Sequence, residues 1–235
     1  MTCAHLLCGC VGIVRVFEHD LVAAAYLILL AALLDFGDGF VARLLKATSA
    51  IGKELDSLAD MVTFGVLPAC ILFDLLESNG FGSYPMAFSA FSIAVFSALR
   101  LAKFNIDPRQ TDSFIGVPTP ANALVVASFP LMLAFQPQYA GLIRNPYSLY
   151  GYVAAMSFLL VAEIPLFALK FKTFGWAENR VKFIFLGLSG VLLLLLQFAA
   201  VPLVVGLYVS MSIIENQVKR RGAEISQRPQ RKISP

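Results

Sequence analysis

Four aspartates in and beside apolar segments are the residues of this sequence best suited to chemistry. Asp35 and Asp38 are three residues apart, and Asp56 and Asp60 are four residues apart. Residues at these spacings lie on one face of a helix, so each pair can project its carboxylates in the same direction. Ionisable groups within membrane-length apolar segments are costly to bury and therefore indicate function.

Four carboxylates that converge repel one another unless they are protonated or a cation lies among them. A set of oxygen ligands without a nearby cysteine or histidine in the sequence suits a hard divalent ion such as Mg²⁺ or Mn²⁺. Two such ions can hold a diphosphate and stabilise both the attacking and the leaving oxygen of a displacement. The aspartates therefore predict a metal site with Asp35, Asp38, Asp56 and Asp60 as ligands.

The residues between the two aspartate pairs are compatible with binding of a phosphate ligand. Gly39 and Gly52 allow close approach of a ligand or a neighbouring helix, and Ala42 is also small. Arg43 can contact phosphate in a bidentate manner, and Ser49 offers a hydroxyl group. Alternatively, the two glycines serve only helix packing and Arg43 is a topology charge.

The composition predicts that these residues lie in a polytopic membrane protein. Of the 235 residues, 58% are hydrophobic and 14% are charged, whereas soluble domains are about 45–50% apolar and about 25% charged. Apolar segments lie near 3–17, 21–45, 53–77, 84–104, 119–136, 147–169, 182–198 and 200–216. The last two form one stretch that we divide near Pro202. We expect an all-α transmembrane bundle of about eight spans, without strands and without a nucleic-acid partner.

The distribution of basic residues supports this division. With a cytoplasmic N-terminus, all of the 18 Lys and Arg residues except Arg15 and Arg144 lie on the cytoplasmic side. The aspartates then lie at the cytoplasmic ends of the second and third spans. We expect one transmembrane domain over residues 1–216 and a basic, disordered cytoplasmic tail over residues 217–235. The charges of this tail serve as a topology anchor or, alternatively, favour anionic lipid headgroups.

The spacing of the site residues resembles the signature of the CDP-alcohol phosphatidyltransferase family. Asp35-x-x-Asp38-Gly39-x-x-Ala42-Arg43 is followed by eight residues and then by Gly52-x-x-x-Asp56-x-x-x-Asp60. The stretches LLCGCVGIV (6–14), ELDSLADMVTFGVLPA (54–69), LRLAKFN (99–105) and FIGVPTPANA (114–123) resemble the phosphatidylserine synthase branch of that family. The similarity covers most of the chain and is weakest after about residue 140.

The resemblance implies transfer of a phosphatidyl group from CDP-diacylglycerol to the hydroxyl of L-serine, with release of CMP. It implies that Asp35, Asp38 and Asp56 bind two divalent ions, Mg²⁺ or Mn²⁺, and that Asp60 contacts the second ion and acts as general base. It further implies that Gly39, Ala42 and Gly52 border the cytidine, while Arg43 and Ser49 hold phosphate. Family members are typically homodimers with six core helices, so two of the eight spans would be peripheral. A bacterial-type inner membrane is the expected location.

The N-terminus departs from the family pattern, which usually has an interfacial segment ahead of the first span. Either the sequence begins late, or His5 and its neighbours help to seat the nucleotide. No partner for His5 or His19 follows from the sequence.

The acceptor is expected to contact residues near the end of the fourth span. Serine carries a carboxylate, for which Arg100 and Lys103, followed by Asn105, are candidate partners; the alternative is that both cations only face water. Glu163 lies within the predicted sixth span, where it either orients the serine ammonium or pairs with a basic side chain. Pro165 is expected to kink that helix.

Two other functions remain open at this point. The same chemistry could serve another acceptor, such as glycerol phosphate, an inositol phosphate or an amino alcohol. An ion or proton-coupled transporter could use the aspartates as a relay. Transporter sites tend to lie near the membrane midplane in broken helices and inverted repeats, whereas these acids cluster at one end and no repeat is visible.

Overall fold

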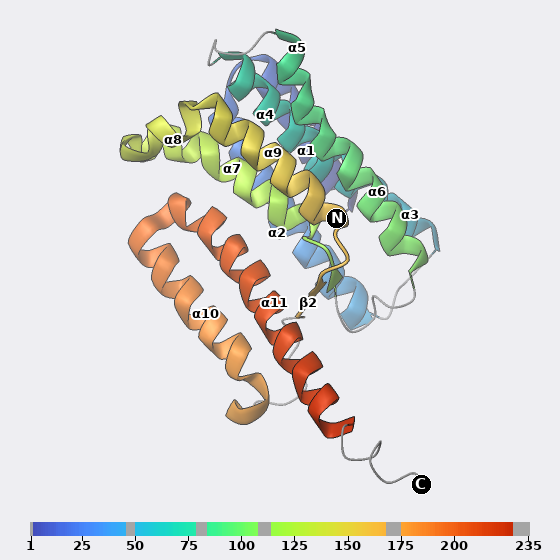
Figure 1. The fold of residues 1–235 in the computed structure, drawn as a ribbon. Helices are drawn as coiled ribbons and strands as arrows, with labels where there is room; N and C mark the ends of the chain where they lie inside the picture. Colours follow the sequence, from blue (N-terminus) through green and yellow to red (C-terminus); the bar gives the residue numbers. More distant parts are fainter. Residues whose placement is uncertain (1, 46–49, 79–83, 108–113, 168–174, 228–235) are drawn as a thin grey trace, which may run out of the picture.

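The protein is described by a computed structural model over residues 2–45, 50–78, 84–107, 114–167 and 175–227. Helices dominate these ranges, as Figure 1 shows. In chain order they are α1 (Thr2–Phe17), α2 (Leu21–Leu45), α3 (Ala50–Asp60), η1 (Met61–Val66), α4 (Leu67–Ser78), α5 (Tyr84–Ala87), η2 (Phe88–Phe91), α6 (Ser92–Ile106), α7 (Thr119–Phe135), η4 (Pro137–Tyr139), α8 (Ala140–Arg144), α9 (Pro146–Val161), α10 (Trp176–Leu196), η5 (Gln197–Ala199) and α11 (Ala200–Gln227). The prediction of a helical fold is confirmed.

Several of these helices are long and apolar enough to cross a membrane. They are Leu21–Gly39, Ile51–Ser78, Pro85–Ile106 and Asn179–Val218, which makes four, or five if the bent pair Thr119–Phe135 and Pro137–Arg144 forms one span. Helices α1 and α9 are apolar but have only 16 residues each, fewer than the about 20 that a full crossing needs. The count of eight spans therefore stays a prediction.

The apolar stretch from Asn179 to Val218 folds back on itself. Helix α10 ends at Leu196, Gln197 has a positive φ of 49°, and η5 leads into α11. Figure 1 shows α10 and α11 running side by side as a hairpin, and the two helices contact each other. The stretch is divided as predicted, but the break is at Gln197 and not near Pro202.

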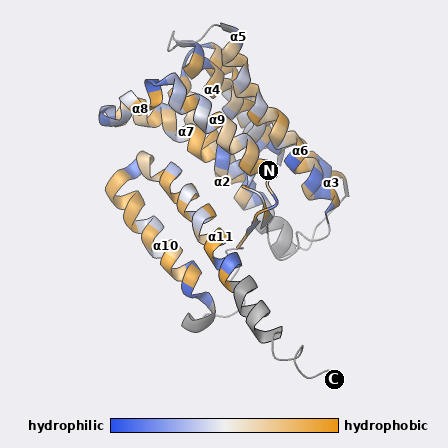
Figure 2. Cartoon of the chain, viewed as in Figure 1, coloured by the Kyte–Doolittle hydropathy of each residue, from blue (hydrophilic) through white to orange (hydrophobic). Residues whose placement is uncertain are grey.

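Large apolar side chains cover much of the outside of the bundle. Leu194 is 84% exposed and Leu195 is 74% exposed, and α10 and α11 carry further exposed leucines and valines. Figure 2 shows hydrophobic residues along the length of most helices. Such a surface suits lipid, and the helices satisfy their backbone hydrogen bonds internally, as a membrane requires. The protein is an integral membrane protein.

A short strand pair, which differs from the prediction, joins the segment before α7 to the segment after α9. β1 (Phe114–Ile115) pairs antiparallel with β2 (Pro165–Leu166). The expected sixth span over 147–169 is therefore wrong at its end, because α9 stops at Val161 and Pro165 begins a strand instead of kinking a helix. The backbone amide of Gly116 adds a 3.0 Å hydrogen bond to the carbonyl of Ile164.

Small residues allow α1 to pack closely against η1 and α4. The buried face of α1 consists of His5, Gly9, Gly12 and Val16. A Cβ atom at Gly12 would lie 2.5 Å from Leu67 Cδ2, so a larger residue there would push the helices apart. This close packing places His5 beside the end of α3.

The connection between β1 and α7 generates a prediction about stability. Gly116 has a φ of +73°, and an added Cβ would lie 2.6 Å from the carbonyl oxygen of Leu160. The left-handed conformation alone costs other residues about 1–2 kcal/mol, and the contact adds to that cost. Gly116→Ala should therefore lower the midpoint of thermal unfolding in detergent micelles.

The matched control is Gly151→Ala, because nothing lies within 4 Å of a Cβ at Gly151 in the middle of α9. Alanine has the higher helix propensity, so this control should unfold at the wild-type temperature or slightly above it. Equal midpoints for the two variants would show that the turn at Gly116 does not constrain the fold.

Candidate active site

Three of the four predicted aspartates meet at one point of the bundle. Asp35 comes from α2, and Asp56 and Asp60 come from one face of α3. His5 of α1 completes this group, and one ligand atom from each of the four residues lies within 4.8 Å of the others. We call these four residues the acidic cluster. The helical spacing of the aspartates predicted the convergence of carboxylates, and the structure confirms it for these three.

Asp38 lies next to the acidic cluster but is engaged elsewhere. The Thr2 hydroxyl of α1 donates a hydrogen bond to Asp38 Oδ2. Asp38 is nevertheless close enough to Asp35 and Asp56 for their charges to interact. Its expected role as a fourth carboxylate ligand stays a prediction.

His5 belongs to the acidic cluster, whereas the sequence suggested for it only a role in seating the nucleotide. Its side chain is fully buried, and its ring stacks on that of Phe64 with a centroid distance of 4.8 Å. The sequence does contain a pattern that indicates burial of His5. One face of α1 repeats at helical spacing through His5, Gly9, Gly12 and Val16. That spacing places His5 on the packing face of α1, although it does not reveal which helix the face contacts.

The predicted nucleotide-binding residues flank the acidic cluster in the chain. Gly39, Ala42 and Arg43 lie in the last turns of α2, and Gly52 lies in the first turn of α3. Ser49 is outside the described residues, and the same holds for the side chains of Ala42 and Arg43. Their contacts with a nucleotide therefore stay predictions.

Arg100 reaches the interior of the bundle from α6. Its side chain is only 6% exposed, and its charge interacts with that of Asp60. Arg100 and Lys103 also line a small pocket with Glu163, which lies beyond the end of α9. Because the guanidinium of Arg100 is buried, the alternative that it only faces water is wrong. Binding of the acceptor by Arg100 stays a prediction.

Asn105 and Glu163 have surroundings that the sequence did not indicate. The Asn105 side chain donates a 2.9 Å hydrogen bond to Ser57 Oγ, and the backbone carbonyl of Asn105 accepts one from Lys53 Nζ. These bonds tie the end of α6 to α3.

Glu163 is exposed and follows α9, so its predicted place deep within a span is wrong. The apolar sequence runs on past the end of the helix, which hydropathy alone cannot detect.

A buried acid that the sequence did not indicate as a functional residue lies in α4. Asp74 Oδ1 is 2.6 Å from His19 Nδ1, which gives His19 the partner that the sequence did not reveal. His19 is in the turn between α1 and α2 and has a φ of 58°. This pair ties that turn to α4.

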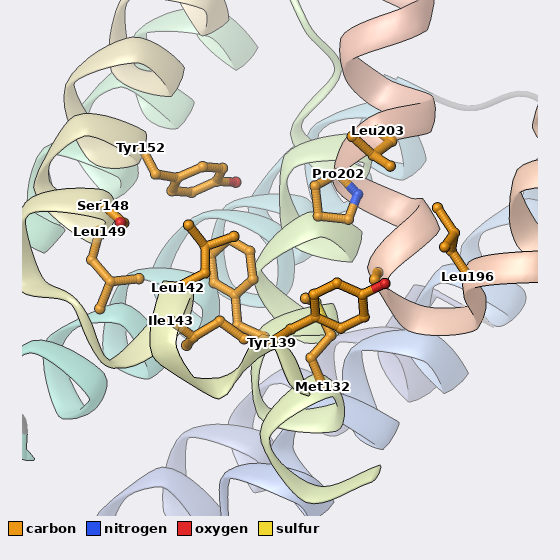
Figure 3. Close-up of a pocket in the computed structure, with 12 residues that line it drawn as sticks. Met132, Tyr139, Leu142, Ile143, Ser148, Leu149, Tyr152, Leu196, Pro202 and Leu203 are labelled. Carbon is orange, nitrogen blue, oxygen red and sulfur yellow. The ribbon is translucent and has the colours of Figure 1, made fainter. Parts of the chain in front are cut away.

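A second concave region lies between α7, α8, α9 and the turn of the α10–α11 hairpin. It has a volume of about 310 Å³ and is lined mainly by apolar side chains, among them Met132, Leu142, Leu149 and Leu196. Figure 3 shows these side chains around the space. None of the described residues that line it is charged, so it does not suit a diphosphate.

The donors of the acidic cluster are suitable ligands for a divalent cation. Asp60 Oδ1 and both ring nitrogens of His5 are buried and have no hydrogen-bond partner among the described residues. Buried polar groups are usually satisfied, and unsatisfied ones at a site call for an ion or a ligand. Three carboxylates with an imidazole can supply that ion with oxygen and nitrogen ligands.

Comparison with known proteins agrees with this geometry. The sequence model of the CDP-alcohol phosphatidyltransferase family matches residues 1–169, which include the whole acidic cluster and Arg100. A CDP-diacylglycerol--serine O-phosphatidyltransferase of Helicobacter pylori (strain J99) is 35% identical over 218 residues, covering 91% of this chain and 87% of the relative.

Two further relatives carry the same name. The protein of Bacillus subtilis is 36% identical over 143 residues, covering 57% of this chain and 77% of its own length. That of Methanocaldococcus jannaschii is 35% identical over 158 residues, covering 61% of this chain and 75% of its own length. With the family model matched over most of its helices and the acidic cluster assembled, the chain belongs to the CDP-alcohol phosphatidyltransferase family.

Proposed function

We propose that the protein transfers the phosphatidyl group of CDP-diacylglycerol to the hydroxyl of L-serine. The bond between the serine oxygen and the phosphatidyl phosphorus forms, the bond from that phosphorus to the oxygen of CMP breaks, and the products are phosphatidylserine and CMP. The observation that carries the proposal is the acidic cluster within the matched family region. The names of the relatives favour serine as the acceptor.

The acidic cluster accounts for the cofactor. We infer that Asp35, Asp38, Asp56 and Asp60 hold two divalent ions, Mg²⁺ or Mn²⁺. Such ions neutralise the charge of the diphosphate and polarise its oxygens. At the ends of α2 and α3, Gly39, Ala42 and Gly52 would border the cytidine, while Arg43 and Ser49 would bind phosphate.

Asp60 is the residue best placed to accept the proton of the serine hydroxyl. Its Oδ1 atom is buried without a hydrogen-bond partner among the described residues, so it is free to bind an acceptor or a cation. The charge of nearby Arg100 interacts favourably with its ionised form. General-base catalysis requires this carboxylate to come within hydrogen-bond distance of the attacking hydroxyl.

The pocket beside Asp60 has charges that complement a zwitterionic amino acid. Arg100 and Lys103 supply positive charge for a carboxylate, and Asp107 and Glu163 supply negative charge for an ammonium group. Because all four line one small pocket, and the charge of Arg100 interacts with that of Asp60, serine bound there could present its hydroxyl to Asp60. Asn105, the third candidate for contact with the acceptor, lies near the same end of α6, where its side chain donates a hydrogen bond to Ser57.

The proposed function also includes an orientation in the membrane and an oligomeric state. The basic loops favour an orientation in which the site faces the cytoplasm from the inner membrane. The lipid donor can then keep its acyl chains among the helices and present its diphosphate at the interface. The family resemblance favours a homodimer.

The first test is the reaction itself. Purified protein in detergent should release CMP from CDP-diacylglycerol when L-serine and Mn²⁺ or Mg²⁺ are both present. Glycerol phosphate, inositol phosphate and ethanolamine should support at most background release. Full activity after chelation and desalting, or faster release with another acceptor, would contradict the proposed metal dependence or the proposed acceptor, respectively.

Asp60→Asn tests the base. The amide cannot accept the serine proton, so the rate of CMP release should fall by about 10²- to 10⁴-fold, the usual range for loss of a general base. Binding of CDP-diacylglycerol, measured by isothermal titration, should remain. Asp20→Asn is the matched control, because Asp20 only caps α2 through the amide of Ala23 and asparagine caps equally well. A relay transporter would instead release no CMP in the wild type.

Arg100→Ala tests recognition of the acceptor. Loss of a hydrogen bond to a charged group costs about 1.5–3 kcal/mol, so the KM for serine should rise by about 10- to 100-fold. The KM for CDP-diacylglycerol should change little. Arg15→Ala serves as control, since Arg15 is half-exposed and pairs with Glu18 at 2.8 Å. Unchanged kinetics with serine in Arg100→Ala would exclude Arg100 from the acceptor site.

A further inference from the structure

We propose that His5 supplies a nitrogen ligand to the divalent cation that Asp35, Asp56 and Asp60 hold. This inference rests on the metal-dependent function proposed above and adds to it a residue outside the aspartate motif. It makes α1 part of the catalytic centre, since the ligands of one ion would come from α1, α2 and α3.

The distances within the acidic cluster are compatible with one shared ion. The ligand atoms of its four residues all lie within 4.8 Å of one another. Two ligands on opposite sides of a hard cation lie about 4 to 5 Å apart, because each metal–ligand distance is about 2.0–2.6 Å. Only small side-chain adjustments are therefore needed for all four atoms to contact one ion.

The hydrogen-bonding state of His5 is the second, independent observation. The side chain is fully buried, and neither Nδ1 nor Nε2 has a hydrogen-bond partner among the described residues. Nε2 is 3.9 Å from Asp60 Oδ1, which is too long for a hydrogen bond. An unsatisfied buried polar atom costs about 1–3 kcal/mol. An ion between the two residues would satisfy a nitrogen of His5 and Oδ1 of Asp60 together.

Packing holds the imidazole in place without any ion. Its ring lies against that of Phe64, with an angle of 30° between the ring planes. The hydroxyl of Thr63 donates a 3.3 Å hydrogen bond to the backbone carbonyl of His5, and Gly9 leaves room for Thr63 one turn later. The imidazole of His5 is thus held in position for metal binding before any ion is present.

A nitrogen ligand has a consequence for the choice of metal. Mg²⁺ prefers oxygen ligands, whereas imidazole binds transition-metal ions readily. His5 should therefore shift the preference of this position from Mg²⁺ toward Mn²⁺. The second ion expected near Asp38 lacks this nitrogen and would keep the preference of an oxygen site.

The experiment measures the nitrogen directly by electron spin echo envelope modulation of bound Mn²⁺. Untagged wild-type protein in detergent is titrated with Mn²⁺ in a buffer without imidazole. The chain has only two histidines, which makes the assignment simple. His5→Gln removes the proposed ligand. His19→Gln is the matched control, because His19 pairs with Asp74 at 2.6 Å outside the acidic cluster.

We expect ¹⁴N modulation of histidine type in the wild type and in His19→Gln, and its loss in His5→Gln. Mn²⁺ affinity of His5→Gln should fall by about 10-fold or more, because loss of a group that merely supports a metal ligand already lowers metal affinity by about 10- to 100-fold. Wild-type protein labelled with ¹⁵N-histidine should show the modulation of ¹⁵N instead. That measurement needs no substitution and does not depend on whether a variant folds.

Three results would overturn the inference, and they can be distinguished from one another. Bound Mn²⁺ without histidine modulation in the wild type, together with normal serine-dependent CMP release, would refute ligation by His5 and leave the proposed function intact. Absence of any Mn²⁺ binding would refute both. Retained modulation in His5→Gln would also refute ligation by His5.

Discussion

Mutual repulsion of carboxylates is the constraint on which the arrangement of this bundle depends. Two like charges about 4 Å apart repel by about 4 kcal/mol in the environment typical of protein sites. Asp35, Asp56 and Asp60 lie at such distances from one another. A divalent cation turns this repulsion into attraction, but before the cation binds the helices must hold the side chains together. Packing between the helices of the bundle must therefore offset the repulsion between these carboxylates.

That packing energy comes from the contacts around α3. On one side, α1 reaches η1 and α4 through a face of small residues, and the ring of His5 stacks on Phe64. On the other side, Asn105 at the end of α6 bonds to Ser57 of α3. Directly after Asp60, η1 adopts a π-helical conformation, which is often found at functional sites. Helix α3 is thereby fixed from both sides at the residues that carry the charges.

Local periodicity explains which parts of this arrangement the sequence predicts. Asp56 and Asp60 share a face because they are one turn apart in one helix, and no tertiary information is needed for that. His5 joins them from a different helix, and its spacing marks a packing face without naming the partner. The end of α9 at Val161 was missed because apolar residues continue beyond it, so hydropathy does not change where the backbone leaves the helix. The requirement for glycine at position 116 is likewise a tertiary effect, because the carbonyl of Leu160, distant in the sequence, leaves no room for a Cβ there.

The C-terminal hairpin positions the segment that follows α9, although the family model ends at residue 169. The segment after α9 has few backbone partners of its own, since β1 offers only two residues. Helix α11 supplies the rest: the Tyr208 hydroxyl donates a 2.7 Å hydrogen bond to the carbonyl of Phe167, and Asn216 donates to that of Pro165. These bonds hold the chain that carries Glu163 opposite Arg100. Substitutions at this face of α11 should therefore act on the proposed acceptor pocket more than on the acidic cluster.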